Sequence, residues 1–190
     1  GQNNVQGSCD MGSFPHEFSG YRHVSDDSVR ETFEKMWGAK LDDEPGLRIS
    51  NMLDEAVENR FKGLLVQGED IAQSDPDTQH VTAGLAAMEC VVVQDLFLNE
   101  TAKYAHVFLP GASFLEKDGT FTNAERRINR VRQVMAPLAG KAEWQVTVDL
   151  ARALGFEMNY AHPSDIMDEI ATLTPTFAGV SYAKLDELGS

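Results

Sequence analysis

Two short apolar runs, each followed by polar residues, constrain the fold of this chain more than any other feature. The first, Gly63–Gln67, has consecutive apolar residues without alternation, which is typical of a short strand buried on both faces of a parallel sheet. The second covers residues 90–93 and has the same character, and a helical pattern at about residues 77–89 lies between the two runs. A strand, a helix and a strand in this order predict a βαβ unit whose two strands end at the same edge of the sheet.

Further elements of the same kind extend this unit into an α/β fold. Residues 106–109 predict a third short strand, and helical turns are expected before it at residues 99–105. Residues 143–154 carry apolar side chains at helical spacing and predict an amphipathic helix that Gly155 ends. The fold class that we expect is α/β, with a doubly wound, mostly parallel sheet flanked by helices in a Rossmann-like three-layer sandwich.

Helices are also expected before and after this region. Ser28 and Glu31 form a capping-box pattern at the start of one helix, and Gly38 is expected to end it. Ser50 is expected to cap a second helix, and these two helices are predicted to cover the sheet. Pro163 is expected to start a further helix near the end of the chain.

The remaining segments are predicted to be less regular. Residues 1–24 contain several glycines without helical or alternating periodicity and predict an irregular segment. Residues 119–123 and 128–134 predict extended segments. Four of the sixteen Lys and Arg residues lie in or near them: Arg126, Arg127, Arg130 and Arg132. Glu125, Arg126 and Arg127 could form a structural ion pair on a loop, or the guanidinium groups could face a pyrophosphate or a partner subunit.

Composition argues against several classes of function. A net charge of −14 argues against nucleic acid or an anionic membrane as a general partner, because both are bound by basic surfaces. The two cysteines, Cys9 and Cys90, lie far apart, so neither a disulfide framework nor a cysteine-held cluster is expected. No apolar run has the roughly 20 residues of a membrane span, and no signal-peptide pattern is present. We therefore expect a cytoplasmic protein, and the lack of an initiator Met leads us to expect a piece of a larger chain.

Common catalytic and cofactor motifs do not occur in the sequence. No Gly-x-Gly-x-x-Gly pattern follows a predicted strand and no Gly-x-x-x-x-Gly-Lys-Ser/Thr is present, so ordinary NAD sites and P-loop chemistry lack support. The five histidines show no spacing that is typical of zinc sites. The sequence therefore shows no catalytic machinery.

Polar side chains at the predicted strand ends are the candidates for ligand binding. Asp70 and Asp95 each follow a strand, where a carboxylate can accept paired hydrogen bonds from ribose hydroxyls or from the Watson–Crick edge of guanine. Either acid could instead be a solvated turn residue or a helix cap. Gln94 adds a donor and an acceptor beside Asp95. Ser74 could cap the helix after the first strand, either as a plain cap or in a way that turns backbone N–H groups toward a phosphate.

Several stretches together resemble one family. In chain order they are Gly1-Gln2-Asn3-Asn4-Val5-Gln6-Gly7-Ser8-Cys9-Asp10-Met11-Gly12, Gln67-Gly68-Glu69-Asp70 with Ser74-Asp75, Val93-Gln94-Asp95-Leu96-Phe97, His106-Val107-Phe108-Leu109-Pro110, and Glu116-Lys117-Asp118-Gly119-Thr120-Phe121-Thr122-Asn123-Ala124-Glu125-Arg126-Arg127. This set resembles the molybdopterin (bis-guanine dinucleotide) oxidoreductases, and most of all the catalytic alpha subunit of formate dehydrogenase. The resemblance runs from residue 1 to about residue 155.

The resemblance implies a division of the chain into three parts. Residues 1–24 would be an irregular, Gly-rich segment near the cofactor. Residues 25–155 would be an α/β domain that binds a guanosine, and residues 156–190 a C-terminal helical extension of the same domain. The chain would be an internal piece of the alpha subunit, and its partners would be the other domains of that subunit and the electron-transfer subunits of the complex.

The resemblance also implies roles for individual residues. The position of Gln2 lies near the molybdenum and pterin in the family, and Glu143 falls where a family member has Asp at the guanosine site. The positions that line the guanosine and phosphate site are Asp70, Ser74, Gln94 and Asp95. Ser74 stands where a relative has Thr, and it keeps the hydroxyl. His106 stands where relatives often carry Asp, and no role is assigned to it.

The same resemblance places the catalytic groups outside this chain. The metal-ligating Cys or selenocysteine, its neighbouring His and the cluster-binding cysteines would lie upstream of Gly1, and a substrate-orienting Arg would immediately precede it. We therefore predict no catalytic and no metal-ligating residue here, and an isolated chain that binds cofactor weakly and is inactive.

The expected parent reaction is the two-electron oxidation of formate to CO2. It would use a molybdenum or tungsten bis(molybdopterin guanine dinucleotide) cofactor, and the electrons would leave through iron–sulfur clusters. Two alternatives stay open at this stage. The same domain could belong to a nitrate reductase or to the large subunit of a respiratory NADH dehydrogenase, or the chain could be a stand-alone nucleotide-binding or interaction module.

Overall fold

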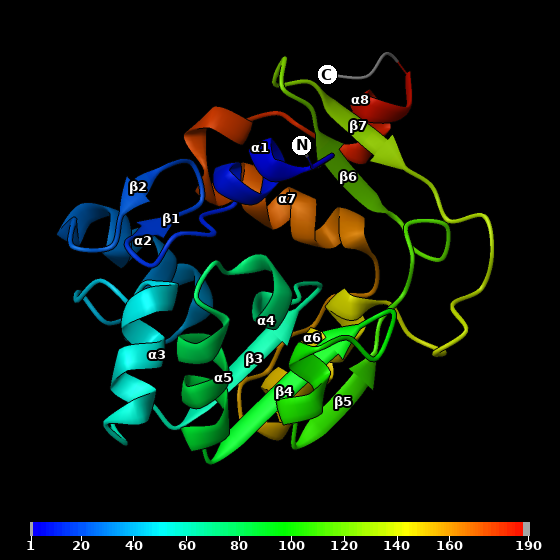
Figure 1. Cartoon of the computed structure of the whole chain (residues 1–190). Coiled ribbons are helices and arrows are strands. Elements are labelled where there is room, and N and C mark those ends of the chain that lie inside the picture. Colours follow the sequence, from blue (N-terminus) through cyan, green and yellow to red (C-terminus); the bar gives the residue numbers. More distant parts are fainter. Residues whose placement is uncertain (1, 188–190) are drawn as a thin grey trace. The chain divides into compact units, whose positions relative to one another are not determined.

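The computed structural model describes residues 2–187, and the chain forms two compact units (Figure 1). The first unit combines Gly1–Gly46, Asp118–Gln133 and Ala151–Ser190, and the second combines Leu47–Lys117 with Val134–Leu150. The boundaries of these units differ from those of the three parts that the resemblance implies. The roles of those three parts stay predictions.

A three-stranded parallel sheet forms the centre of the second unit in the described residues. Its order is β3 (Gly63–Gln67), β4 (Cys90–Asp95) and β5 (Val107–Pro110), with β4 in the middle (Figure 1). The register pairs Gln67 with Gln94 and Asp95 with Pro110. The expected βαβ unit and the third strand are therefore confirmed, because the apolar runs supply the strands and the helical pattern supplies the crossover.

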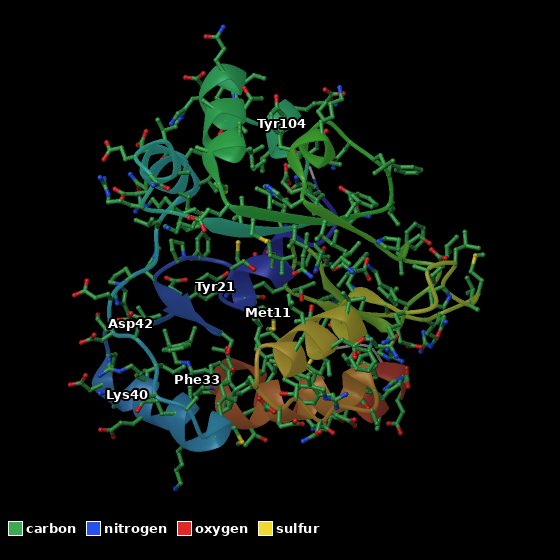
Figure 2. All side chains as sticks on the ribbon, turned by 90° about the horizontal axis from the view of Figure 1, so that it is seen from below. Met11, Tyr21, Phe33, Lys40, Asp42 and Tyr104 are labelled. Atoms are coloured by element: carbon green, nitrogen blue, oxygen red, sulfur yellow. The ribbon has the colours of Figure 1, made fainter. Side chains whose placement is uncertain are left out.

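Helices flank this sheet, as the α/β prediction requires. The chain passes from β3 to β4 through α4 (Ile71–Ser74) and α5 (Thr78–Ala87), and from β4 to β5 through the short 3-10 helix η1 (Thr101–Tyr104). On one face, α5 and α3 (Ile49–Val57) share a core with the strands, and Tyr104 packs against it (Figure 2). The fully buried members of this core include Leu53, Val81, Leu85, Val91 and Val93.

The prediction that the first strand is buried on both faces is wrong. Val66 is buried, whereas Leu65 is 38% exposed, so burial alternates along β3. The reason is that β3 forms an edge of this sheet and only the face carrying Leu64 and Val66 packs into the core with α3 and α5. Burial in this structure thus follows the position of the strand in the sheet as well as its apolar run.

The first unit contains most of the remaining elements. It begins with α1 (Val5–Asp10) and the small hairpin β1 (Glu17–Phe18) and β2 (Arg22–His23), so part of the segment that was predicted to be irregular forms regular structure. Its other elements are α2 (Asp27–Trp37), the antiparallel pair β6 (Gly119–Thr122) and β7 (Ile128–Val131), α7 (Pro163–Leu173), η2 (Pro175–Phe177) and α8 (Tyr182–Glu187). The extended segments and the helix from Pro163 are confirmed.

Both predicted serine caps are wrong. The carboxylate of Asp26 caps α2 by accepting from the backbone N–H groups of Ser28 and Val29 at 2.9 and 3.3 Å, and Ser28 lies inside the helix. Ser50 is the second residue of α3, which begins at Ile49. Gly38 ends α2 with φ at +63°, as predicted.

The two helices that were expected to cover the sheet belong to different units. α3 packs on α5 in the second unit, whereas α2 belongs to the first unit. There Phe33 of α2, which is labelled in Figure 2, stacks on Phe18 with a centroid distance of 4.3 Å. The apolar face of α2 therefore packs against residues of the segment 1–24, which was expected to be irregular.

One arginine organises the β6–β7 hairpin and α8. The guanidinium of Arg130 is 8% exposed, lies 2.9 Å from the Asp118 carboxylate and 3.1 Å from that of Asp186, and stacks 3.7 Å above the ring of Tyr182. The free-energy cost of burying this charge is offset by the two carboxylates and by the face of the aromatic ring. No helix among residues 2–187 combines the length and the apolar character needed to cross a membrane.

Replacing this guanidinium tests its structural role. We expect Arg130→Met to lower the free energy of unfolding by about 2 kcal/mol, because it leaves the partly buried Asp118 carboxylate without its cation and removes the stacking on Tyr182, whereas Asp186 keeps its contact with Arg132. Arg127→Met is the matched control, since that side chain is 74% exposed and pairs with Glu125 at 3.5 Å, and it should change stability by less than about 0.5 kcal/mol. Urea unfolding of the two variants makes the comparison, and equal losses would contradict the assignment.

Candidate functional site

The carboxyl ends of β3 and β4 carry polar side chains on both faces of the sheet. Successive residues of a strand point to opposite faces, and Val66 and Val93 point into the core under α3 and α5. Asp95 therefore lies on that same face, whereas Gln67 and Gln94 lie on the opposite one. The predicted site residues of the second unit thus lie at the carboxyl edge of the sheet in two groups, one on each face.

On the first face, Asp70 is held by the start of η1. Its Oδ1 accepts from the backbone N–H of Thr101 at 2.9 Å and from the Thr101 hydroxyl at 2.6 Å, and its Oδ2 accepts from the N–H of Glu100 at 3.2 Å. The Thr101 hydroxyl is fully buried and also accepts from the N–H of Ala72 at 3.0 Å. Asp70 thus joins the end of β3, α4 and η1.

These hydrogen bonds affect the ionisation of Asp70. Desolvation of the carboxyl acts to raise its pKa, but the hydrogen bonds from Thr101 and Glu100, with a smaller contribution from the charge of Lys103, hold the pKa below its usual value. The carboxylate is therefore ionised at neutral pH and stabilises the segment that it contacts.

Asp95 contacts the same segment as Asp70. Its Oδ2 accepts from the side-chain amide of Asn99 at 2.8 Å and its Oδ1 from the N–H of Leu96 at 2.6 Å. The structure thus brings the two acids together through residues 99–101, and it gives both of them hydrogen bonds from their own chain. Their cap-like contacts correspond to one of the two interpretations that the sequence left open.

Ser74 does not cap the following helix, so that prediction is wrong. It is the last residue of α4, it is exposed, and its hydroxyl donates to Glu69 at 2.5 Å. The cap of α5 is Asp77, whose carboxylate accepts from the N–H of His80 at 3.0 Å. The prediction failed because residues 75–77 separate α4 from α5, a break that the apolar spacing does not show.

On the second face, an amide pair links β3, β4 and α6 (Glu143–Ala153). Nε2 of Gln67 donates to Oε1 of Gln94 at 2.8 Å and to Oγ1 of Thr147 at 3.3 Å. Gln94 is 2% exposed, and its Nε2 has no hydrogen-bond partner among residues 2–187. A buried amide nitrogen in this state costs free energy, which makes it a marker for a missing acceptor.

Glu143, in the first turn of α6, has a similar unused atom. Its Oε1 accepts from the N–H of Ala112 at 3.1 Å and lies 2.8 Å from Nζ of Lys117. Its Oε2 is buried and lacks a partner within the described part of the chain. We call Nε2 of Gln94, a donor, and Oε2 of Glu143, an acceptor, the open pair, because both lack a partner; Oε2 of Glu17, in the first unit, is a third such atom.

Two residues of this site were missed at the sequence level. Gln67 was predicted as the end of a strand and belongs to a stretch that carries the family resemblance, but no role was given to it; its position beside Gln94 follows once the two strands are paired in register. Lys117 belongs to a motif that carries the family resemblance, but its contact with Glu143 spans 26 residues of sequence and no local pattern indicates it. Long-range pairing is the signal that single-sequence patterns lack.

The structure places the remaining candidates in the first unit. Gln2 is exposed. Arg127 pairs with Glu125, and Arg126 has φ at +61° and lies 3.9 Å from Asp10. These ion pairs fit the loop interpretation, and the role predicted for Gln2 stays a prediction. Within residues 2–187, no group of three or more His, Cys, Asp or Glu side chains is arranged to hold a metal ion.

The second unit has an α/β fold, and parallel sheets of this kind bind ligands outside the carboxyl ends of their strands. A family model of the molybdopterin oxidoreductases matches residues 2–153. The chain therefore belongs to the molybdopterin oxidoreductase family, as the resemblance indicated.

Curated relatives match almost the whole chain. "Putative formate dehydrogenase YrhE" of Bacillus subtilis strain 168 is 46% identical over 187 residues, which is 98% of this chain and 19% of that protein. "Probable oxidoreductase YjgC" of the same organism is 44% identical over 191 residues, covering 100% of this chain and 19% of the relative. The chain thus spans about a fifth of the length of the relatives that it matches.

A solved structure shares the fold. Acetylene hydratase from Pelobacter acetylenicus superposes with a TM-score of 0.61 over 85% of this chain and 23% of the other, at 18% sequence identity. This likeness supports the α/β fold alone.

The family implies a molybdopterin cofactor in the full protein, and the second unit offers suitable polar groups for it. The open pair supplies a buried donor and a buried acceptor at the edge where parallel sheets bind ligands. Lys117, 31% exposed beside Glu143, adds a positive charge. These residues fit a polar group that both donates and accepts hydrogen bonds.

The contacts of Asp70 give a test of its structural role. We expect Asp70→Asn to lower the free energy of unfolding at pH 7 by about 1 kcal/mol, because hydrogen bonds to a charged acceptor are lost. A folded-state pKa below the unfolded value of about 3.9 means that this stabilisation is present above that pH and is lost as pH falls through the folded pKa. Unfolding measured from pH 7 to pH 3 should therefore show the difference between variant and wild type shrinking with acidity.

The control is Thr101→Val, which removes one hydroxyl donor to the same carboxylate. We expect it to reduce the pH dependence without abolishing it, since the two backbone donors remain. A constant difference between Asp70→Asn and wild type across this pH range would refute the role given to the carboxylate.

Proposed function

We propose that this chain is the α/β domain that holds one guanosine arm of a bis(molybdopterin guanine dinucleotide) cofactor in a molybdenum- or tungsten-dependent formate dehydrogenase. Membership of the molybdopterin oxidoreductase family and the name of the relative YrhE support the class of enzyme. The parent reaction in this proposal is the two-electron oxidation of formate to CO2, with electrons leaving through iron–sulfur clusters toward partner subunits.

The open pair is the observation that carries the proposal. Guanine presents the O6 acceptor beside N–H donors, so one base can satisfy both a buried amide nitrogen and a buried carboxylate oxygen. Gln94 and Glu143 would hold this base. Lys117 keeps Glu143 in place through its ion pair at 2.8 Å.

The other predicted residues have supporting roles in the proposal. Asp70 and Asp95 stabilise residues 99–101 and so shape the first face of the edge. Ser74, exposed near that edge, would contact a phosphate, and Gln2 would lie near the pterin and the metal. We assign no catalytic and no metal-ligating residue to this chain.

The cofactor supplies the redox chemistry when bound, and this chain supplies binding and orientation. Each hydrogen bond that the open pair gains on binding removes the cost of a buried polar group. The isolated chain is expected to bind the cofactor weakly and to lack formate dehydrogenase activity.

The substitution Gln94→Leu tests the proposal. In the full-length protein that contains this chain, we expect it to weaken cofactor retention roughly tenfold, because one hydrogen bond to the base is lost. The measurement is the GMP released by acid hydrolysis per polypeptide, together with the molybdenum or tungsten content. In the 190-residue chain the same change should leave the free energy of unfolding unchanged or raise it by up to about 1 kcal/mol, because it removes a buried unpaired group.

Gln79→Leu, at an exposed position of α5, is the matched control and should retain wild-type GMP and metal content. A wild-type protein that folds without guanine nucleotide or metal would overturn the proposal. Tight binding of GTP by the isolated chain, stronger than binding of GDP, would point to a stand-alone nucleotide-binding module.

A further inference from the structure

We propose that Gln67 is a positioning residue that determines which atom of the Gln94 amide faces the ligand. This inference rests on the proposed function, and it deepens it by naming what makes the site selective. Gln67 itself is not expected to touch the ligand. It acts through the buried amide beside it.

The hydrogen bonds run in one direction from α6 to Gln94. The Thr147 hydroxyl donates to the backbone carbonyl of Glu143 at 3.0 Å, so its proton is used and its oxygen can only accept from Gln67. The amide atom of Gln67 that approaches Thr147 at 3.3 Å must therefore be Nε2. The second hydrogen of that nitrogen points to Gln94, which must present Oε1, at 2.8 Å.

The consequence is that Nε2 of Gln94 is turned to the other side. An amide that presents its oxygen to Gln67 has its nitrogen in the open pair. The backbone carbonyl of Glu143, in the first turn of α6, thus determines that Gln94 presents its nitrogen in the open pair, and the side chain of Glu143 supplies the acceptor. Gln67 transmits this effect from Thr147 to Gln94, because its one nitrogen contacts both residues.

This arrangement defines the chemistry of the ligand. The group at the open pair must accept a hydrogen bond from Gln94 and donate one to Glu143. A fully ionised phosphate offers acceptors alone and would face the Glu143 carboxylate, so it is disfavoured there. A nucleobase edge with both kinds of atom, such as that of guanine, meets both requirements.

The isosteric substitution Gln67→Glu inverts the polarity of the site. A carboxylate can only accept, so the Gln94 amide should turn its Nε2 toward Glu at position 67 and leave Oε1 in the open pair. Two acceptors then face the ligand. We expect GMP retention in the full-length protein to fall roughly tenfold or more, and Gln67→Met, which frees the amide without inverting it, to give a smaller loss.

Two controls separate positioning from an effect of the added charge. Gln79→Glu adds the same charge at an exposed position of α5 and should leave GMP retention unchanged. GMP retention in the Gln67→Glu variant should stay low when the salt concentration is raised, because the loss of GMP comes from the reversed orientation of the Gln94 amide. Recovery at high salt would show charge repulsion and overturn the inference.

A direct readout uses the nitrogen-15-labelled chain without cofactor. We expect the side-chain amide protons of Gln94 to shift downfield and exchange more slowly in Gln67→Glu, because they then donate to a carboxylate. Unchanged Gln94 amide signals would overturn the inference whatever the outcome for the cofactor. Absence of GMP from the wild-type full-length protein would instead count against the proposed function, and the amide signals would still decide the positioning role.

Discussion

The parallel register of β3 and β4 is the constraint on which the rest of the second unit depends. It places Gln67 beside Gln94 and directs Val66 and Val93 into the core under α3 and α5. A shift of either strand by one residue would turn Val66 or Val93 out of the core and bring the neighbouring amide, Gln67 or Gln94, into it. The burial of these valines therefore holds the two amides on the face that α6 contacts.

In the proposed function, the polar groups at the carboxyl edge of this sheet have two roles: those on one face stabilise the fold, and those on the other face bind the ligand. On one face, Asp70 and Asp95 receive hydrogen bonds from residues 96–101 and hold the start of η1. On the other face, the two members of the open pair contact neighbouring side chains, Gln94 that of Gln67 and Glu143 that of Lys117. A site of this kind is preorganised, because the groups that position the ligand-facing atoms are already bound.

Local patterns in the sequence predicted the elements but not their long-range partners. The apolar runs gave β3 at its observed bounds, and helical spacing gave α6 and the helix from Pro163, because side-chain periodicity depends only on near neighbours. The caps at Ser28 and Ser50 were wrong, since Asp26 competes for the same N–H groups and α3 begins one residue earlier. The partner of Asp70 lies 31 residues away at Thr101, and no periodicity reveals such a contact.

The cost of the open pair is what links structure to function in this chain. Burial of an unpaired donor and an unpaired acceptor lowers the stability of a domain that could replace both with apolar side chains. In the proposed function, a sequence that keeps them at the carboxyl edge of a parallel sheet, with Gln67 and Lys117 beside them, gives up stability for a group that completes their hydrogen bonds. That group is the guanine of the proposed cofactor, and the unpaired atoms are where in this unit it would bind.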